Sequence, residues 1–170
     1  MNTPTRLSKL IAICTLAAWP LCSHAASIEI PVGTLQPQIE KAFPKTKNSL
    51  NLSEPLLALE ASPAVAVLCG RWEYAPKVLA SSAERALGGK FCAESRLQWV
   101  AQAGEVALSS VRVRSLTFGE GQSLPPTALA LVNSILPGQL EGLVVYTAPR
   151  FVGWAIKNLR PMDGRLQIEF

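Results

Sequence analysis

The chain has 170 residues, 49% of them hydrophobic, and a formal net charge of +4. This length fits one domain that is large enough to bury a real core. The modest charge, without a cluster of Lys and Arg interleaved with aromatic residues, argues against a nucleic-acid partner.

The first residues have the parts of an export signal. Arg6 and Lys9 provide a positive start, and residues 10–19 form an apolar run that is too short to cross a bilayer. Small residues precede the expected cut. The sequence therefore predicts a signal peptide over residues 1–25 and a single domain over residues 26–170.

Lipid attachment at the cut would need a small residue just before a cysteine. Cys14 follows Ile13 and Cys22 follows Leu21, so neither cysteine has this context. We expect a periplasmic protein released by signal cleavage, with a lipid anchor or a retained signal as the alternatives. The few basic residues could favour contact with an anionic membrane surface, although a solvated exterior explains them more simply.

Cleavage would leave few groups for catalysis. The only histidine, His24, would be lost, and the net charge would fall to +2 because Arg6 and Lys9 are removed. No GxSxG elbow, SxxK pair or Gly-rich phosphate loop is present. We therefore expect no catalytic residue, metal or cofactor. Two acids that meet only in space could still form a glycosidase site.

Two cysteines, Cys69 and Cys92, would remain in a compartment that oxidises thiols, which predicts a structural disulfide between them. Such a bridge would stabilise the fold by about 3 kcal/mol. A reactive thiol or a zinc ligand is the alternative, but the sequence lacks the histidine and the CxxC spacing typical of zinc sites.

The mature chain begins with a short helix and continues with strands. An apolar face at Leu35, Ile39 and Phe43 predicts a helix that ends at Pro44. From Leu50 onward the hydrophobic period changes to two, which predicts strands.

The next strands are expected over residues 65–74 and from residue 97. The latter turns near residues 102–104 into a return strand over residues 106–118. The phase of the return strand slips twice, near Ser110 and Ser115, which predicts bulges or strong curvature.

Residues 123–146 have a helical period and almost no charge, with Glu141 as the only ionisable residue between Ser123 and Tyr146. This pattern predicts a second, longer helix that is covered on most sides by sheet or by a ligand. Pro137 should break or kink it after Leu136. A turn and a final strand over residues 166–170 complete the chain.

The order of elements and three local signatures resemble the YceB-like family, bacterial envelope proteins of unassigned function whose fold is similar to the tubular lipid-binding proteins. The signatures are the opening helix over residues 30–43, the Leu136-Pro137 step, and the ending formed by residues 155–161 and 164–170. They are patterns of turns and hydrophobicity. The resemblance covers most of residues 28–170.

The resemblance implies an α+β fold in which a curved antiparallel sheet wraps around a long apolar helix, with a short helix at the N-terminus. It also implies an apolar groove between helix and sheet that could hold an acyl chain. Candidate groove walls are Leu129, Val132, Leu136, Leu140 and Val144 on the helix and Trp99, Val111, Val113 and Phe118 on the sheet. Each of these residues could instead belong to an ordinary core.

These observations favour non-catalytic binding of a lipid or another hydrophobic small molecule. The alternative is an envelope interaction or assembly module in which the same sheet is fully packed. A binder must keep a groove that its own side chains leave empty, whereas a module should have a closed core and an exposed apolar patch.

Overall fold

The computed structural model describes residues 26–75, 87–119, 126–149 and 156–170. These residues form nine strands and two helices. In chain order the elements are β1 (Ser27–Pro31), α1 (Val32–Glu40), β2 (Lys45–Lys47), β3 (Leu50–Ala61), β4 (Ala64–Tyr74), β5 (Leu87–Val100), β6 (Glu105–Leu116), α2 (Pro126–Leu140), β7 (Val144–Thr147), β8 (Asn158–Met162) and β9 (Arg165–Glu169).

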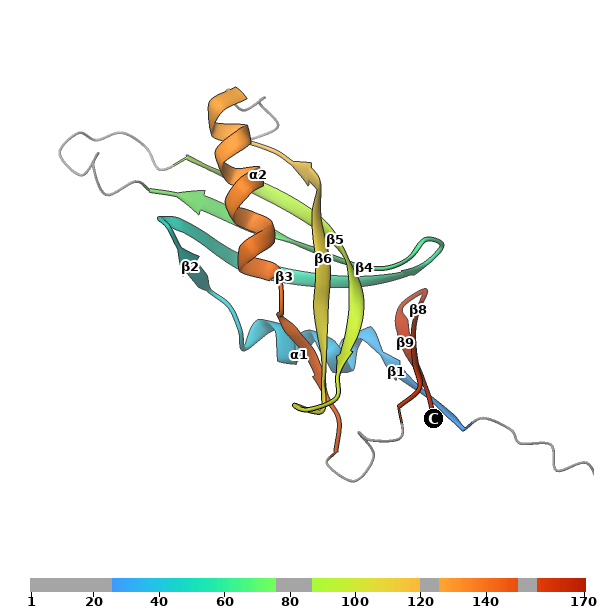
Figure 1. The fold of residues 1–170 in the computed structure, drawn as a ribbon. Coiled ribbons are helices and arrows are strands. Elements are labelled where there is room, and N and C mark those ends of the chain that lie inside the picture. The colour runs from blue at the N-terminus through green and yellow to red at the C-terminus, as the bar shows by residue number, and fades with distance from the viewer. Residues whose placement is uncertain (1–25, 76–86, 120–125, 150–155) are drawn as a thin grey trace, which may run out of the picture.

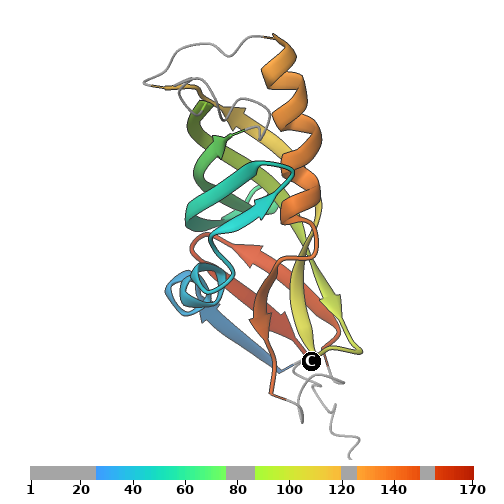
Figure 2. The ribbon, with the colours of Figure 1, turned by 90° about the vertical axis from the view of Figure 1, so that its left-hand side faces the viewer.

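The strands form two antiparallel sheets. The larger sheet has the order β2-β3-β4-β5-β6-β7, so each strand pairs with its neighbour in the chain, and the smaller sheet has the order β1-β9-β8. The larger sheet is curled, and α2 lies against one side of it (Figures 1 and 2). The smaller sheet lies toward the opposite end of the molecule from the start of α2.

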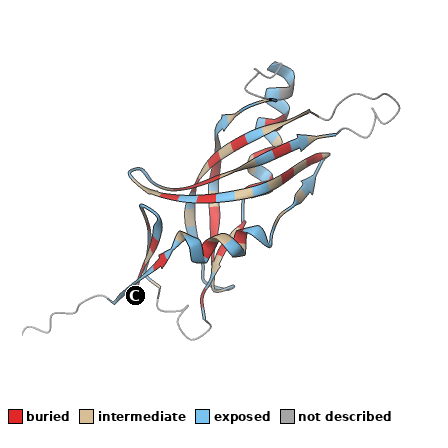
Figure 3. Ribbon diagram, turned by 180° about the vertical axis from the view of Figure 1, so that it is seen from behind, coloured by how far each residue is buried: buried red, intermediate tan, exposed pale blue. Residues whose placement is uncertain are grey.

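One hydrophobic core joins both sheets and both helices. α1 contacts β3 and β7, α2 contacts β6 and β3, and β8 contacts β3, β4 and β5. We call the face of the larger sheet that carries the buried Leu50, Leu52 and Trp72 its inner face and the opposite face its outer face. Figure 3 shows the buried positions along the strands.

Two irregularities bend β6, as the phase of its sequence predicts. The pairing of β6 with β5 shifts between Cys92 and Ala93 and again between Glu94 and Arg96. At the second shift Ser110 has a left-handed backbone with φ of 54°. Because a bulge inserts one extra residue and turns the strand, side chains on both sides of it keep the same face toward the core. The predicted slips near Ser110 and Ser115 are confirmed.

The expected fold, a curved antiparallel sheet wrapped around a long apolar helix, is wrong. The described residues are mostly β, and the two helices among them are short, with nine residues in α1 and fifteen in α2. α2 ends at Leu140 because Gly142 takes a left-handed turn with φ of 74°. The apolar residues that follow form β7 and pair with β6. Their side chains alternate as in a strand, and the buried ones belong to the same core.

Other local predictions have mixed outcomes. The helix ending before Pro44 and the turn near residues 102–104 are confirmed. The break after Leu136 is wrong, because α2 continues through Pro137 and ends at Leu140. β5 begins at Leu87, ten residues before the predicted start.

Candidate functional site

The apolar stripe of α2 extends beyond the part that the core covers. Val132, Leu136 and Leu140 follow the i, i+4 spacing and are almost fully buried. Leu129 lies one turn earlier on the same side of the helix but is 37% exposed, and Leu131 is 39% exposed. Figure 3 shows the exposed first turns of α2 in pale blue. The N-terminal half of α2 therefore presents leucines that its own core leaves partly uncovered.

The end of β6 brings further apolar side chains to this region. Val113, Leu116 and Phe118 are half-buried and pack against the core. α2 contacts β6, and in Figure 2 the end of β6 and the first turn of α2 lie at the same end of the molecule, on opposite sides of it. We call the side chains of Leu129, Val113, Leu116 and Phe118 at this end of the molecule the apolar rim.

Close packing between β5 and the end of β6 positions the rim. The Trp72 indole N–H donates to the Thr117 carbonyl at 3.0 Å, and the Gly119 N–H donates to the Gly88 carbonyl at 2.9 Å. A Cβ atom on Gly89 would overlap the Thr117 carbonyl oxygen, so this close approach needs glycine. These contacts place Phe118 at the edge of the core.

The nine predicted wall residues fall into three groups. Val111, Val132, Leu136 and Leu140 are buried in the core; Trp99, Val113 and Phe118 are partly buried against it; Leu129 and Val144 lie outside that cluster. Val144 was expected on the helix but begins β7. Trp99 pairs with Val106, at the opposite end of β5 from Gly88, so the structure does not bring it to Phe118.

Two polar side chains fasten the C-terminal end of α2. The amide nitrogen of Gln139 donates to the carbonyls of Lys47 at 3.0 Å and Leu50 at 3.2 Å. The Glu141 carboxylate accepts hydrogen bonds from the backbone N–H groups of Ser110 and Val111. This end of α2 is thus attached to the β2–β3 turn on one side and to the β6 bulge on the other.

Two lysines that the sequence analysis missed lie beside this attachment. Lys45 pairs with Leu52 and Lys47 with Leu50, and directly opposed residues of paired strands share a face. Because Leu50 and Leu52 are fully buried on the inner face, both lysines project to the side where α2 packs. The alternation of Lys-Thr-Lys before Leu-Asn-Leu was the available signal.

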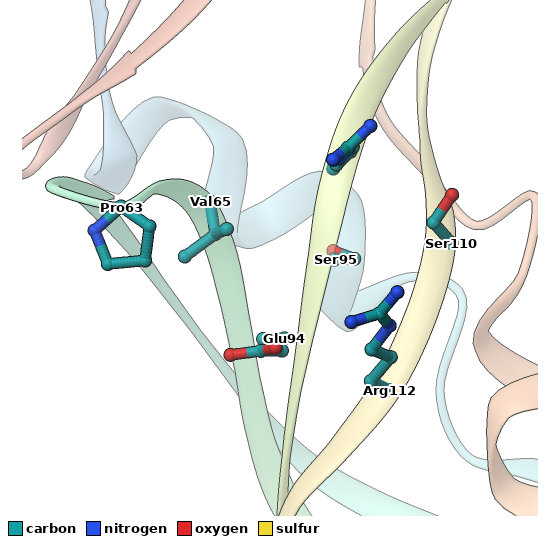
Figure 4. Close-up of a pocket in the computed structure, with 7 residues that line it drawn as sticks. Pro63, Val65, Glu94, Ser95, Ser110 and Arg112 are labelled. Atoms are coloured by element: carbon teal, nitrogen blue, oxygen red, sulfur yellow. The ribbon is translucent and has the colours of Figure 1, made fainter.

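A pocket of about 240 Å³ lies on the outer face and has a different character. Its lining includes Glu94, Arg96, Arg112 and Ser110, from β5 and β6. Figure 4 shows Glu94 and Ser95 on one strand and Ser110 and Arg112 on the neighbouring strand. This charged hollow is unsuited to an apolar ligand.

Cys69 and Cys92 form a disulfide that joins β4 to β5, as predicted. The two residues are directly opposed in the sheet, and their neighbours Leu68, Phe91 and Ala93 face the core. The alternation of side chains therefore places the bridge on the outer face.

No protein-family model matches the chain, and no curated protein matches it. Within the described residues, no helix combines the length and the apolar character that a membrane crossing requires.

Proposed function

We propose that this protein binds a hydrophobic ligand, a lipid or an acyl chain, at the apolar rim and performs no catalysis. One observation carries the proposal: Leu129 lies on the core-facing stripe of α2, yet it is 37% exposed. A bound chain that covers Leu129 and Phe118 would extend the core by one more turn of the helix. Each buried methylene group would contribute about 0.8 kcal/mol.

The size of the rim favours a small ligand over a protein partner. A stable protein interface buries about 800 Å² on each side. Of the described side chains that are both large and exposed, Leu129 and Leu131 lie on α2, and Ile28, Leu56 and Val100 lie on three separate strands. The alternative, an envelope interaction or assembly module, draws support from the complete burial of Leu136 and Leu140.

The proposal includes export to the periplasm and membership of the YceB-like envelope proteins. The Cys69–Cys92 disulfide supports the export step, because such bridges form and persist in oxidising compartments.

Native mass spectrometry of protein purified without detergent tests the proposal. We expect a stoichiometric adduct, which organic extraction should identify as a lipid or a fatty acid. Protein that stays bare after incubation with envelope lipids would favour the interaction module.

A variant pair tests whether the rim is the site. Leu129→Gln should weaken binding of the neutral fluorophore N-phenylnaphthylamine about tenfold, since it removes apolar contact area. Leu56→Gln is the matched control, because Leu56 is 63% exposed on the outer face of β3. Equal loss of binding in both variants would contradict a site at the rim.

A further inference from the structure

The two lysines of β2 lie at the same end of the larger sheet as the apolar rim. Lys47 pairs with Leu50, Leu50 with Tyr74, and Tyr74 with Leu87. The next residue of β5, Gly88, accepts a hydrogen bond from Gly119, the residue after Phe118. One row of the sheet therefore runs from the lysines to the rim. Four strand spacings separate β2 from β6, about 19 Å in a flat sheet and less in this curled one.

Neither lysine of β2 forms an ion pair with another residue that the structure describes. Burial lowers the pKa of Lys45 below its usual value, and repulsion from Lys47 lowers it further. Partial burial of the Lys45 ammonium group without an acid beside it is unfavourable for folding alone.

A buried acceptor near the lysines also lacks a partner. Gln139 is 4% exposed, and its carbonyl oxygen has no donor among the described residues. The amide cannot be reversed, because its nitrogen must donate to the carbonyls of Lys47 and Leu50. A hydrogen-bond donor, such as the hydroxyl of a ligand headgroup, would satisfy this oxygen.

We propose that Lys45 and Lys47 bind the anionic headgroup, a carboxylate or a phosphate, of an amphiphile whose acyl chain lies on the apolar rim. This inference rests on the proposed function and adds the chemical class of the ligand. The ammonium groups donate charge-assisted hydrogen bonds to the anion, and the apolar chain extends along the inner face toward β6.

A structural explanation for the lysines makes a different prediction. Cations near the C-terminal end of α2 would interact favourably with the helix dipole. In that case replacing either lysine should lower stability and leave the choice of ligand unchanged.

Displacement of N-phenylnaphthylamine by three amphiphiles with one chain length tests the inference. The probes are tetradecanoate, tetradecyl phosphate and the neutral methyl tetradecanoate, and the two anions distinguish a carboxylate from a phosphate ligand. We expect at least one anion to bind about tenfold more tightly than the ester. Lys45→Met and Lys47→Met should each abolish most of this preference while keeping wild-type affinity for the ester. Lys90 is an exposed lysine on β5, and Lys90→Met should retain the preference for the anion.

The outcomes separate the two proposals. Equal affinity of the wild-type protein for the anions and the ester, or a preference that survives in both lysine variants, overturns the headgroup site and leaves apolar binding standing. Failure of the fluorophore and all three amphiphiles to bind overturns the proposed function together with the headgroup site. Retained ester affinity in each variant shows that it is folded.

Discussion

The Glu141 carboxylate accepts hydrogen bonds from the backbone N–H of Ser110 at 3.0 Å and of Val111 at 3.1 Å. Glu141 directly follows α2, and Ser110 is the left-handed residue at the β6 bulge. The two contacts satisfy backbone donors that the bulge removes from the strand ladder. The helix end and the bend in the sheet are therefore positioned by one side chain.

Removal of this carboxylate should weaken both elements. We expect Glu141→Ala to lower the free energy of unfolding by about 1–3 kcal/mol, because two backbone donors lose a charged acceptor. Urea unfolding followed by circular dichroism measures the change. Glu73→Ala, on an exposed part of β4, serves as the control. Equal stability of the two variants would show that water replaces the carboxylate without cost.

The backbone of Ser110 predicts a stabilising substitution. A non-glycine residue in the left-handed region is disfavoured, whereas glycine adopts this conformation freely. We expect Ser110→Gly to raise the free energy of unfolding by about 0.5–1 kcal/mol. Ser109→Gly, at the preceding β6 residue, should instead destabilise the strand. A lower melting temperature for Ser110→Gly would contradict the inference that the left-handed backbone of Ser110 is strained.

Lys45 should make stability depend on pH in the alkaline range. Because folding lowers its pKa from 10.5, the unfolded chain binds more protons between the lowered value and 10.5. The free energy of unfolding should therefore gain a contribution that increases with pH across this window. We expect Lys45→Met to remove that contribution and to stabilise the protein at neutral pH, by less than about 1 kcal/mol because solvent screens the exposed part of the side chain.

Chemical denaturation at several pH values measures this change, with Lys90→Met as the control. A gain in stability together with a loss of anion preference would indicate that Lys45 is kept for binding. A loss of stability would instead support the helix-dipole explanation.

The disulfide should contribute to stability without reshaping the inner face. We expect the double variant Cys69→Ala and Cys92→Ala to lose about 3 kcal/mol while keeping affinity for the neutral fluorophore, because the bridge lies on the outer face. Thiol titration of the unfolded wild-type protein should detect no free cysteine in the mature chain. A large drop in affinity for the fluorophore would show that the disulfide determines the structure of the apolar rim.

Local patterns in the sequence predicted much of the architecture. The period of two in β6, with its two changes of phase, predicted a bent strand, and the proline after Phe43 predicted the end of α1. The cysteine pair left after removal of the first 25 residues predicted the Cys69–Cys92 bond. The strand and helix features depend on residues that are close in the chain. The disulfide could be predicted because only one pairing of cysteines remains in the mature chain.

The extent of α2 and the content of the site depended on contacts between distant residues. Apolar residues continue on both sides of Gly142, and the second part pairs with β6 as a strand. Sequence spacing placed Val132 and Leu129 on one stripe, but only packing decided that Val132 is buried and Leu129 is exposed. Likewise, β2 is three residues long, and only its register with β3 turned Lys45 and Lys47 toward the inner face. Hydrophobic periodicity indicates which side chains share a face of one element. The tertiary structure determines which faces pack together and which residues on those faces stay exposed.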